Sequence, residues 1–174
     1  MRKCVFLDRD GVINKDFGYV FSMSQIQLNE NVGKSIRLLN ENGFIVIVVT
    51  NQSGVARGYF DESTVWEINR HIMNLLAEED AHIQEFYVCP HLKQGIVKKY
   101  AVACECRKPN SGMLLAAKKK YDIDLEHSYL IGDKFTDIQA GNNAGLKQSF
   151  LIEMDGSMLQ IVEQILSIED IGET

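Results

Sequence analysis

An unbroken apolar run, Phe44 to Val49, most narrowly limits the folds open to this chain of 174 residues. The run is rich in β-branched residues and carries no polar residue on either alternating face. Such a run is typical of a strand buried on both faces of a parallel sheet. Helical spacing precedes it at Val32, Ile36 and Leu39, and a long amphipathic helix is predicted from Asp61. We therefore predict an α/β fold with a doubly wound, mainly parallel sheet and helices on both faces.

The rest of the chain alternates in the same way. Strands are predicted at Cys4 to Leu7, Ile83 to Val88, Tyr129 to Ile131 and Ser149 to Ile152, and helices at Gly112 to Tyr121, Ile138 to Ala144 and Met158 to Leu166. The length suits one well-packed core, so we expect a single domain spanning residues 1–174. The interval from Asp10 to Thr50 holds only a loop and a helix, so no large cap domain is expected.

Polar side chains follow three of the predicted strands. Asp8 and Asp10 come after the first, Thr50 and Asn51 after the second, and Asp133 after the strand at 129–131. Carboxyl ends of parallel strands meet at one edge of a sheet, where such folds bind ligands. Residues i and i+2 of an extended segment project to the same side, so Asp8 and Asp10 can face one small site. Two carboxylates held that close repel unless a cation or a shared proton offsets the charge. The arrangement favours a divalent metal, and Mg²⁺ suits oxygen ligands.

Two cations, Arg107 and Lys108, complete an inventory that fits phosphoryl transfer. That reaction needs an in-line nucleophile, cations for the phosphoryl oxygens and a metal that offsets charge. We expect Asp8 to attack phosphorus and form an aspartyl-phosphate, while Asp10 protonates the leaving oxygen and later activates water. Taken alone, the Asp-Arg-Asp-Gly segment also fits a solvated turn after an edge strand.

Four segments together resemble the motifs of the haloacid dehalogenase (HAD) superfamily, in their usual order. They are Asp8-Arg9-Asp10-Gly11-Val12, Val49-Thr50-Asn51, Arg107-Lys108-Pro109 and Gly132-Asp133-Lys134-x-x-Asp137. The resemblance implies a HAD-like Rossmannoid fold with Asp8 as nucleophile and Asp10 as acid and base. It also implies that Asp10 lends its backbone carbonyl to Mg²⁺, that Asp133 completes the Mg²⁺ site, and that Asp137 supports it from behind the ligands. Thr50 and Lys108 would bind the phosphate.

The region 89–109 interrupts the alternation and carries Cys89, His91, Cys104 and Cys106. Three cysteines and one histidine form a closed tetrahedral set for structural Zn²⁺, with no position open for catalysis. The paired spacings disfavour the alternative of three buried cysteines and a surface histidine. We expect zinc to staple this inserted loop, which leads directly into the two phosphate-binding cations.

The pattern C-P-H followed by C-x-C-R-K-P resembles the histidinol-phosphatase and heptose-bisphosphatase branch of the superfamily. The segments 17–20 and 50–58 favour the heptose side, whereas Leu92 stands where a second histidine is frequent. The resemblance implies Mg²⁺-dependent removal of the C7 phosphate of a heptose 1,7-bisphosphate, a step toward nucleotide-activated heptose and lipopolysaccharide. Histidinol-phosphate phosphatase is the alternative.

The resemblance also implies a set of substrate contacts. These are Asp16, Phe17, Gly18, Tyr19, Thr50, Asn51, Gln52, Ser53, Arg57, Arg107, Lys108 and Lys134. A second phosphate needs additional cations, and Arg57, Arg107 and Lys134 are the candidates.

Charge and composition narrow the partners. With 24 acidic and 18 basic residues the net charge is -6, which disfavours a nucleic-acid partner but permits a small anionic substrate. No segment approaches the roughly 20 apolar residues of a membrane span, and no signal peptide is recognisable. We expect a cytoplasmic monomer without membrane or nucleic-acid partners. Two other classes stay open: a phospho-receiver signalling domain, which would need neither Asp10 nor zinc, and a zinc-supported binding module without catalysis.

Overall fold

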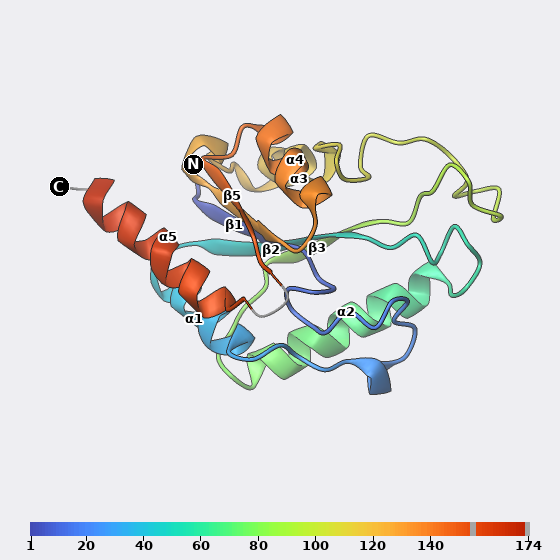
Figure 1. Cartoon of the computed structure of the whole chain (residues 1–174), viewed down its shortest axis with the longest axis horizontal. Coiled ribbons are helices and arrows are strands. Elements are labelled where there is room, and N and C mark those ends of the chain that lie inside the picture. The colour runs from blue at the N-terminus through green and yellow to red at the C-terminus, as the bar shows by residue number, and fades with distance from the viewer. Residues whose placement is uncertain (154–155, 173–174) are drawn as a thin grey trace.

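The computed structural model describes residues 1–153 and 156–172 and contains one five-stranded sheet in the order β3-β2-β1-β4-β5. Every pair of neighbouring strands is parallel, so the predicted sheet is confirmed (Figure 1). The strands are β1 (Cys4–Leu7), β2 (Ile45–Asn51), β3 (Glu85–Cys89), β4 (Tyr129–Gly132) and β5 (Gln148–Leu151).

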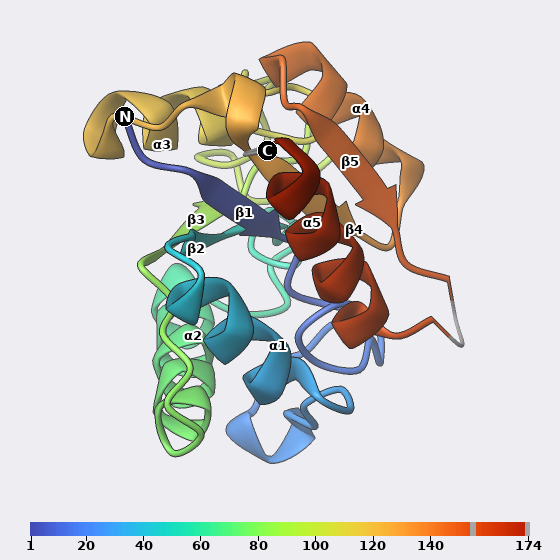
Figure 2. The same ribbon diagram turned by 90° about the vertical axis from the view of Figure 1, so that its left-hand side faces the viewer.

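Helices cover both faces of the sheet. Helices α1 (Val32–Glu41), α2 (Glu62–Ala77) and α5 (Met158–Gly172) lie on one face, and α3 (Gly112–Tyr121) and α4 (Phe135–Ala144) lie on the other (Figures 1 and 2). Two short 3-10 helices, η1 (Met23–Gln25) and η2 (Leu125–His127), lie in the connections. None of the helices in the described part of the chain is long and apolar enough to span a membrane.

The alternation of side chains along β1 explains the two-sided core. Val5 and Leu7 pack into the cluster that includes α1, α2 and α5, whereas Cys4 and Phe6 pack into the cluster that includes α3 and α4. All four residues are fully buried. A strand that buries both faces has no polar face to show, which is why apolar runs rather than alternating patterns mark these strands.

Several boundaries differ from the sequence-based expectation, each for a local reason. Strand β2 continues through Thr50 and Asn51 because both pair with β3. Helix α4 begins at Phe135 rather than Ile138, since Asp137 accepts a hydrogen bond from the backbone N–H of Lys134 and caps the helix start.

The other corrections concern outer elements, where neighbours fix the ends. Strand β3 begins at Glu85 rather than Ile83, because its pairing with β2 starts there. Strand β5 begins at Gln148, paired with Tyr129, and ends at Leu151. Helix α5 continues past Leu166 to Gly172, and Glu169 in that extension is bonded to the body of the protein.

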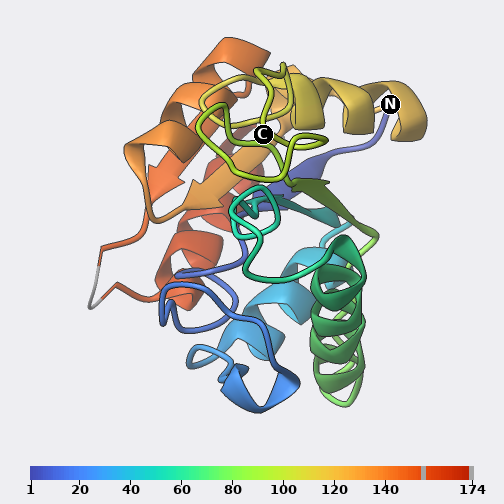
Figure 3. The ribbon, with the colours of Figure 1, turned by 90° about the vertical axis from the view of Figure 1, so that its right-hand side faces the viewer.

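The strand order creates a crevice beside β1. The chain moves from β1 outward to β2 and β3, then returns to the other side of β1 for β4 and β5. In doubly wound folds, ligands bind at the carboxyl ends of the strands where the order reverses. The segments that follow β1, β2 and β3 gather at this end (Figure 3). Between β1 and β2 the chain has only a loop, η1 and α1, as expected for a fold without a large cap.

Candidate active site

Asp8 directly follows β1 and is 6% exposed. Its backbone N–H donates to the carbonyl of Ile131 in β4 at 3.0 Å, so the sheet itself holds this position. Its side-chain Oδ1 accepts hydrogen bonds from the Lys108 ammonium at 2.9 Å and from the Arg9 backbone N–H at 2.8 Å. The carboxylate is therefore oriented by rigid neighbours and keeps its second oxygen for other partners.

Lys108 comes from the loop after β3 and is almost wholly buried. Its Nζ lies 2.9 Å from Asp8 Oδ1 and 2.6 Å from Asp137 Oδ1, and it donates to the Val49 carbonyl at 2.6 Å. Burial alone would lower the pKa of Lys108, but the two carboxylates outweigh it and raise that pKa. The site therefore holds a fixed ammonium group beside Asp8.

The carboxylates of Asp8, Asp133 and Asp137 offer oxygens that lie within 4.8 Å of one another. Burial and the nearby Asp8 carboxylate raise the pKa of Asp133 to about 7. Asp133 Oδ1 is buried without a hydrogen-bond partner in the described structure. Gly11 adopts a φ of 90°, and a Cβ there would collide with the Asp133 carboxylate. Crowded, under-bonded carboxylates of this kind fit Mg²⁺, which prefers oxygen ligands.

The Asp10 carboxylate lies outside that cluster. It forms an ion pair with Arg9 at 3.0 Å and accepts hydrogen bonds from Asn14 Nδ2 at 2.9 Å and Gln52 Nε2 at 2.8 Å. Burial would raise the pKa of Asp10, but Arg9 and these hydrogen bonds outweigh it and lower that pKa. Asp10 is thus held ionised beside Asp8, and its carboxylate does not contribute to the ligand cluster.

Sequence reasoning missed Arg9 and Asn14, two of the three side chains that hold Asp10. Arg9 is fully buried, and its guanidinium donates to Asn69 of α2 at 3.0 Å as well as to Asp10. An arginine between two aspartates in a turn usually points into solvent, so the local pattern carried no signal. Thr136 was also missed, although it lines the site.

The end of β2 supplies two positioning contacts. Gln52 Nε2 reaches both Asp10 and the Thr50 hydroxyl, each at 2.8 Å. Asn51 binds the Lys108 backbone twice, through its Nδ2 to the carbonyl and its Oδ1 to the N–H, both at 3.1 Å. The polar residues at the end of β2 therefore hold the backbone of Lys108 in place, and they also line the cavity.

Two adjoining cavities open at this end of the sheet. The smaller, of about 50 Å³, is lined by Asp8, Asp10, Thr50, Asn51, Lys108, Lys134, Thr136 and Asp137. The larger, of about 340 Å³, is lined by Asp10, Asp16, Gly18, Tyr19, Asn51, Gln52, Ser53, Arg107, Lys108, Lys134 and Thr136. The larger volume lies in the range of small-molecule sites, and three of its lining residues are cations.

Two predicted contacts, Phe17 and Arg57, line neither cavity. Phe17 is 58% exposed. The Arg57 guanidinium carbon instead lies 6.0 Å from the centre of the Tyr19 ring. The other two cations proposed for a second phosphate are in place. Arg107 donates to the carbonyl of His91 at 3.1 Å, and Lys134 pairs with Asp16 at 3.4 Å and with Asp133 at 3.6 Å.

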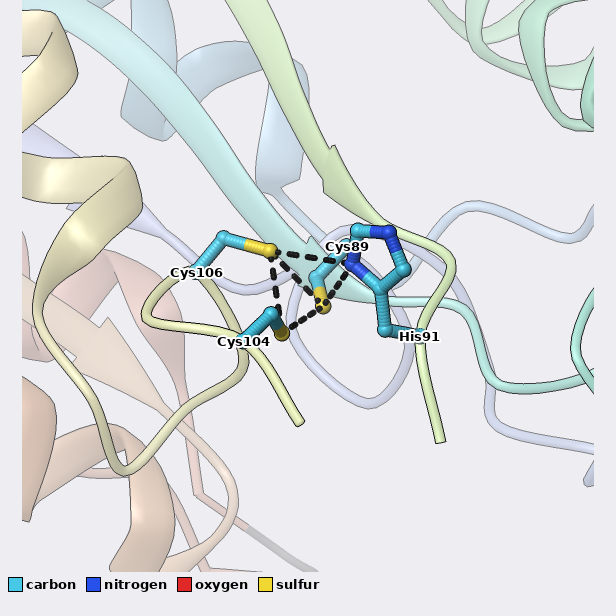
Figure 4. Close-up of side chains that lie close together, drawn as sticks. All are labelled: Cys89, His91, Cys104 and Cys106. Atoms are coloured by element: carbon cyan, nitrogen blue, oxygen red, sulfur yellow. Dashed lines mark hydrogen bonds between the residues drawn. The ribbon is translucent and has the colours of Figure 1, made fainter. Parts of the chain in front are cut away.

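A second ligand cluster lies in the loop after β3, where Cys89, His91, Cys104 and Cys106 point toward one another (Figure 4). Cys106 Sγ lies 3.1 Å from Cys89 Sγ, 3.3 Å from Cys104 Sγ and 3.3 Å from His91 Nδ1. Sulfurs about 2.3 Å from one zinc ion lie about 3.8 Å apart in a tetrahedron. Cys89 Sγ and Cys104 Sγ, 3.6 Å apart, approach that separation, and both contacts of Cys106 are shorter. Burial raises the pKa of the Cys89 thiol, so a thiolate at that position calls for a cation. These residues fit structural Zn²⁺.

Comparison with known proteins agrees with this geometry. A family model described as HAD-hydrolase-like matches residues 105–153, which include Lys108, Asp133 and Asp137. The D-glycero-beta-D-manno-heptose-1,7-bisphosphate 7-phosphatase of Haemophilus influenzae is 41% identical over 152 residues, covering 87% of this chain and 82% of the relative. The D-glycero-alpha-D-manno-heptose-1,7-bisphosphate 7-phosphatase of Photorhabdus laumondii is 39% identical over 151 residues, with the same two coverages of 87% and 82%.

Solved structures point to the same group. The D,D-heptose 1,7-bisphosphate phosphatase from B. bronchiseptica, crystallised with magnesium and phosphate, superposes with a TM-score of 0.83. It is 29% identical, and the match covers 95% of this chain and 99% of that protein. The resemblance predicted from the four motifs is confirmed: the chain belongs to the HAD superfamily, in the family of the D-glycero-D-manno-heptose-1,7-bisphosphate 7-phosphatases.

Proposed function

We propose that this chain is a Mg²⁺-dependent phosphatase that hydrolyses the C7 phosphate of D-glycero-D-manno-heptose 1,7-bisphosphate and releases heptose 1-phosphate. One observation carries the proposal most directly. Asp8 lies after β1, 2.9 Å from a buried ammonium and beside two further carboxylates. It lines the smaller cavity, which adjoins a larger cavity lined by three cations. That arrangement supplies a nucleophile, charge for phosphoryl oxygens and room for a second phosphate.

In the first half of the reaction, an Asp8 oxygen attacks phosphorus while the bond from phosphorus to the C7 oxygen breaks. Lys108 and Thr50 face the small cavity and donate to the phosphoryl oxygens. Asp8, Asp133 and the backbone carbonyl of Asp10 would hold Mg²⁺, and Asp137 would support these ligands. The bound ion would supply positive charge that offsets the Asp8 carboxylate and the phosphate.

Asp10 acts as the general acid and then as the general base. It is ionised in the resting site because Arg9 faces it. A phosphate entering the adjoining cavity brings negative charge close to Asp10 and favours uptake of a proton. Asp10 then gives that proton to the leaving C7 oxygen. In the second half it takes a proton from the water that attacks the aspartyl-phosphate, which restores Asp8 and releases inorganic phosphate.

The sugar and its anomeric phosphate occupy the larger cavity in this proposal. Arg107 and Lys134 bind the C1 phosphate, because both line that cavity and Lys108 is already committed to Asp8 and Asp137. Asp16, Gly18, Tyr19, Asn51, Gln52 and Ser53 contact the sugar. Retention of the anomeric phosphate leaves a product suited to transfer onto a nucleotide, as in the making of lipopolysaccharide heptose.

The test is phosphate release with Mg²⁺ from both anomers of heptose 1,7-bisphosphate, with histidinol phosphate and fructose 1,6-bisphosphate as competitors. Both anomers enter because relatives of nearly equal identity are named for the β and the α form. We expect the highest kcat/KM with one heptose anomer. A higher value with histidinol phosphate would overturn the substrate and leave the catalytic roles standing.

We further propose that the enzyme works in the cytoplasm as a monomer and without a nucleic-acid partner. The net charge of -6 disfavours binding to a phosphate polymer. Light scattering at working concentration checks the assembly state, and a dimer mass would contradict it.

A further inference from the structure

Irregular segments border the larger cavity and touch one another. Residues 16–21 supply Asp16, Gly18 and Tyr19 to its lining, and the turn after β2 supplies Ser53. The loop 89–109, which carries the Cys and His cluster, contacts this turn, since the backbone N–H groups of Ile96 and Val97 donate to the Ala56 carbonyl at 2.8 Å and 3.0 Å. Figure 3 shows the segments after β1, β2 and β3 side by side at this end of the sheet.

Two side chains of the turn hold Tyr19 from outside the cavity. The rings of Tyr19 and Tyr59 lie edge to face, with centroids 4.8 Å apart and planes at 77°. This is a favourable geometry for an aromatic pair. The Arg57 guanidinium carbon lies 6.0 Å from the centre of the same Tyr19 ring, at the limit of a cation–π contact. We call Tyr19, Arg57 and Tyr59 the aromatic clasp.

The segment that carries Tyr19 is anchored at its two ends. Asp16 pairs with Lys134 at 3.4 Å on one side, and Val20 is buried in the core on the other. Between them, Gly18 turns with a φ of 90° and its N–H bonds back to Asp16 at 2.9 Å, within the segment itself. Tyr19 is 40% exposed, so the clasp supplies the lateral contact that fixes its ring.

Backbone hydrogen bonds hold the turn that carries Tyr59. Its backbone N–H donates to the Gly54 carbonyl at 2.9 Å, and the Gly58 N–H donates to the Val55 carbonyl at 3.0 Å. Within the described structure the Tyr59 hydroxyl makes no hydrogen bond, and Tyr59 lines neither cavity. The side chain is 57% exposed, so the contact with Tyr19, rather than core packing, is what its ring provides.

We propose that Tyr59 is a positioning residue for substrate recognition: it holds Tyr19 in the wall of the larger cavity. The inference rests on the proposed function, because it assigns Tyr19 to the sugar half of the substrate. A wall residue held in place before binding lowers the entropy cost of ordering the loop on the ligand. The effect falls on substrates that fill the larger cavity and spares those that need only the Asp8 centre.

The kinetic test compares two substrates in Tyr59→Ala. With heptose 1,7-bisphosphate we expect KM to rise about three- to tenfold, the size of an aromatic pair, with kcat unchanged because ground and transition states lose the same contact. With p-nitrophenyl phosphate both constants stay unchanged. Tyr59→Phe should behave as the wild type. Trp66→Ala removes an aromatic ring of similar exposure on α2 and serves as the control.

Amide hydrogen exchange gives a second readout that needs no substrate. We expect faster exchange at residues 17–19 in Tyr59→Ala and wild-type rates in Tyr59→Phe. If the wild type turns over the heptose substrate but Tyr59→Ala keeps its KM, the inference fails and the function stands. If the wild type does not turn it over, the function fails, and unchanged exchange at 17–19 would overturn the inference as well.

Discussion

The two ligand clusters of this chain differ in what supports them and in what they leave open. The carboxylates of Asp8, Asp133 and Asp137 lie at the ends of β1 and β4 and at the start of α4, against the buried sheet. The thiols and imidazole lie in a loop that has no helix or strand between Cys89 and Gly112. The sheet holds the carboxylate cluster in place. The Cys and His cluster, once it binds zinc, would instead hold together a loop that has no regular secondary structure of its own.

The donor atoms complete the comparison. Three sulfurs and one nitrogen form a closed set for zinc, while two carboxylates and a backbone carbonyl would leave positions for water and phosphate around Mg²⁺. Lys108 connects the two, since it follows Cys106 by two residues and its ammonium lies between Asp8 and Asp137. We infer from this difference that the zinc cluster positions Lys108 and that the carboxylate cluster carries out the reaction in which Lys108 takes part.

The largest effect is expected from Asp8→Asn, which keeps the size of the side chain but removes the nucleophile. We expect kcat to fall by at least about 1,000-fold with an unchanged circular dichroism spectrum. Full activity in this variant would show that the carboxylate cluster is not the reacting one.

Lys108→Met tests the link between the clusters. It leaves two carboxylates buried without their cation, so we expect loss of turnover and a free energy of unfolding lower by about 3 kcal/mol in urea titrations. The control is Lys120→Met, which removes an exposed ion pair with Glu85 at 2.7 Å and should leave the free energy of unfolding nearly unchanged. Equal losses in the two variants would contradict a special role for Lys108.

Cys104→Ser separates structural from catalytic metal. We expect less zinc by elemental analysis and a melting temperature lower by about 5 °C or more, with activity lost in proportion to unfolding. Dialysis into Mg²⁺-free buffer should instead abolish activity and leave the melting temperature within about 2 °C. Unchanged zinc content in the variant would remove Cys104 from the ligand set.

The smallest effect is expected far from both clusters, at Glu169 of α5. Its carboxylate accepts from Lys3 at 2.6 Å, Lys147 at 2.8 Å and Tyr129 at 2.6 Å. Burial would raise the pKa of Glu169, but these donors outweigh it and lower that pKa to about 2. Glu169→Gln should therefore reduce the free energy of unfolding by about 2 kcal/mol at neutral pH without changing kcat.

The pH dependence of that loss has a definite sign. A depressed carboxyl pKa stabilises the fold above the unfolded value, near 4.5, and this contribution disappears as the pH falls toward 2. The difference between wild type and Glu169→Gln should thus shrink over that window in urea titrations. A difference that grows as the pH falls would contradict the assignment.

Much of the fold could be predicted because its strands are buried on both faces. Apolar runs such as Phe44 to Val49 indicate a buried strand even when the neighbouring strands are unknown. The bounds of β1 and α3 agree with the prediction to the residue. Boundaries set by tertiary pairing could not be predicted. The extension of β2 through Asn51 depends on β3, and the start of α4 depends on the Asp137 cap.

The predicted site divides in the same way. Asp8 and Asp133 come together because each directly follows the end of a strand, and the loop after β3 brings Lys108 to Asp8. The ion pair of Asp10 with Arg9 could not be predicted, because the fully buried Arg9 depends on a hydrogen bond to Asn69 in α2. The place of Arg57 against Tyr19 depends on loop packing, which no periodic pattern encodes.

The central claim is that Asp8 carries the phosphoryl group during turnover. The most direct test is intact-protein and peptide mass spectrometry of Asp10→Asn after acid quench with heptose 1,7-bisphosphate, because loss of the base slows hydrolysis of the intermediate. We predict a mass increase of one phosphoryl group on the peptide that contains Asp8, absent in the Asp8→Asn and Asp10→Asn double variant. A phosphoryl group on another residue would contradict the account. So would an Asp10→Asn variant that still releases phosphate but carries no phosphoryl group.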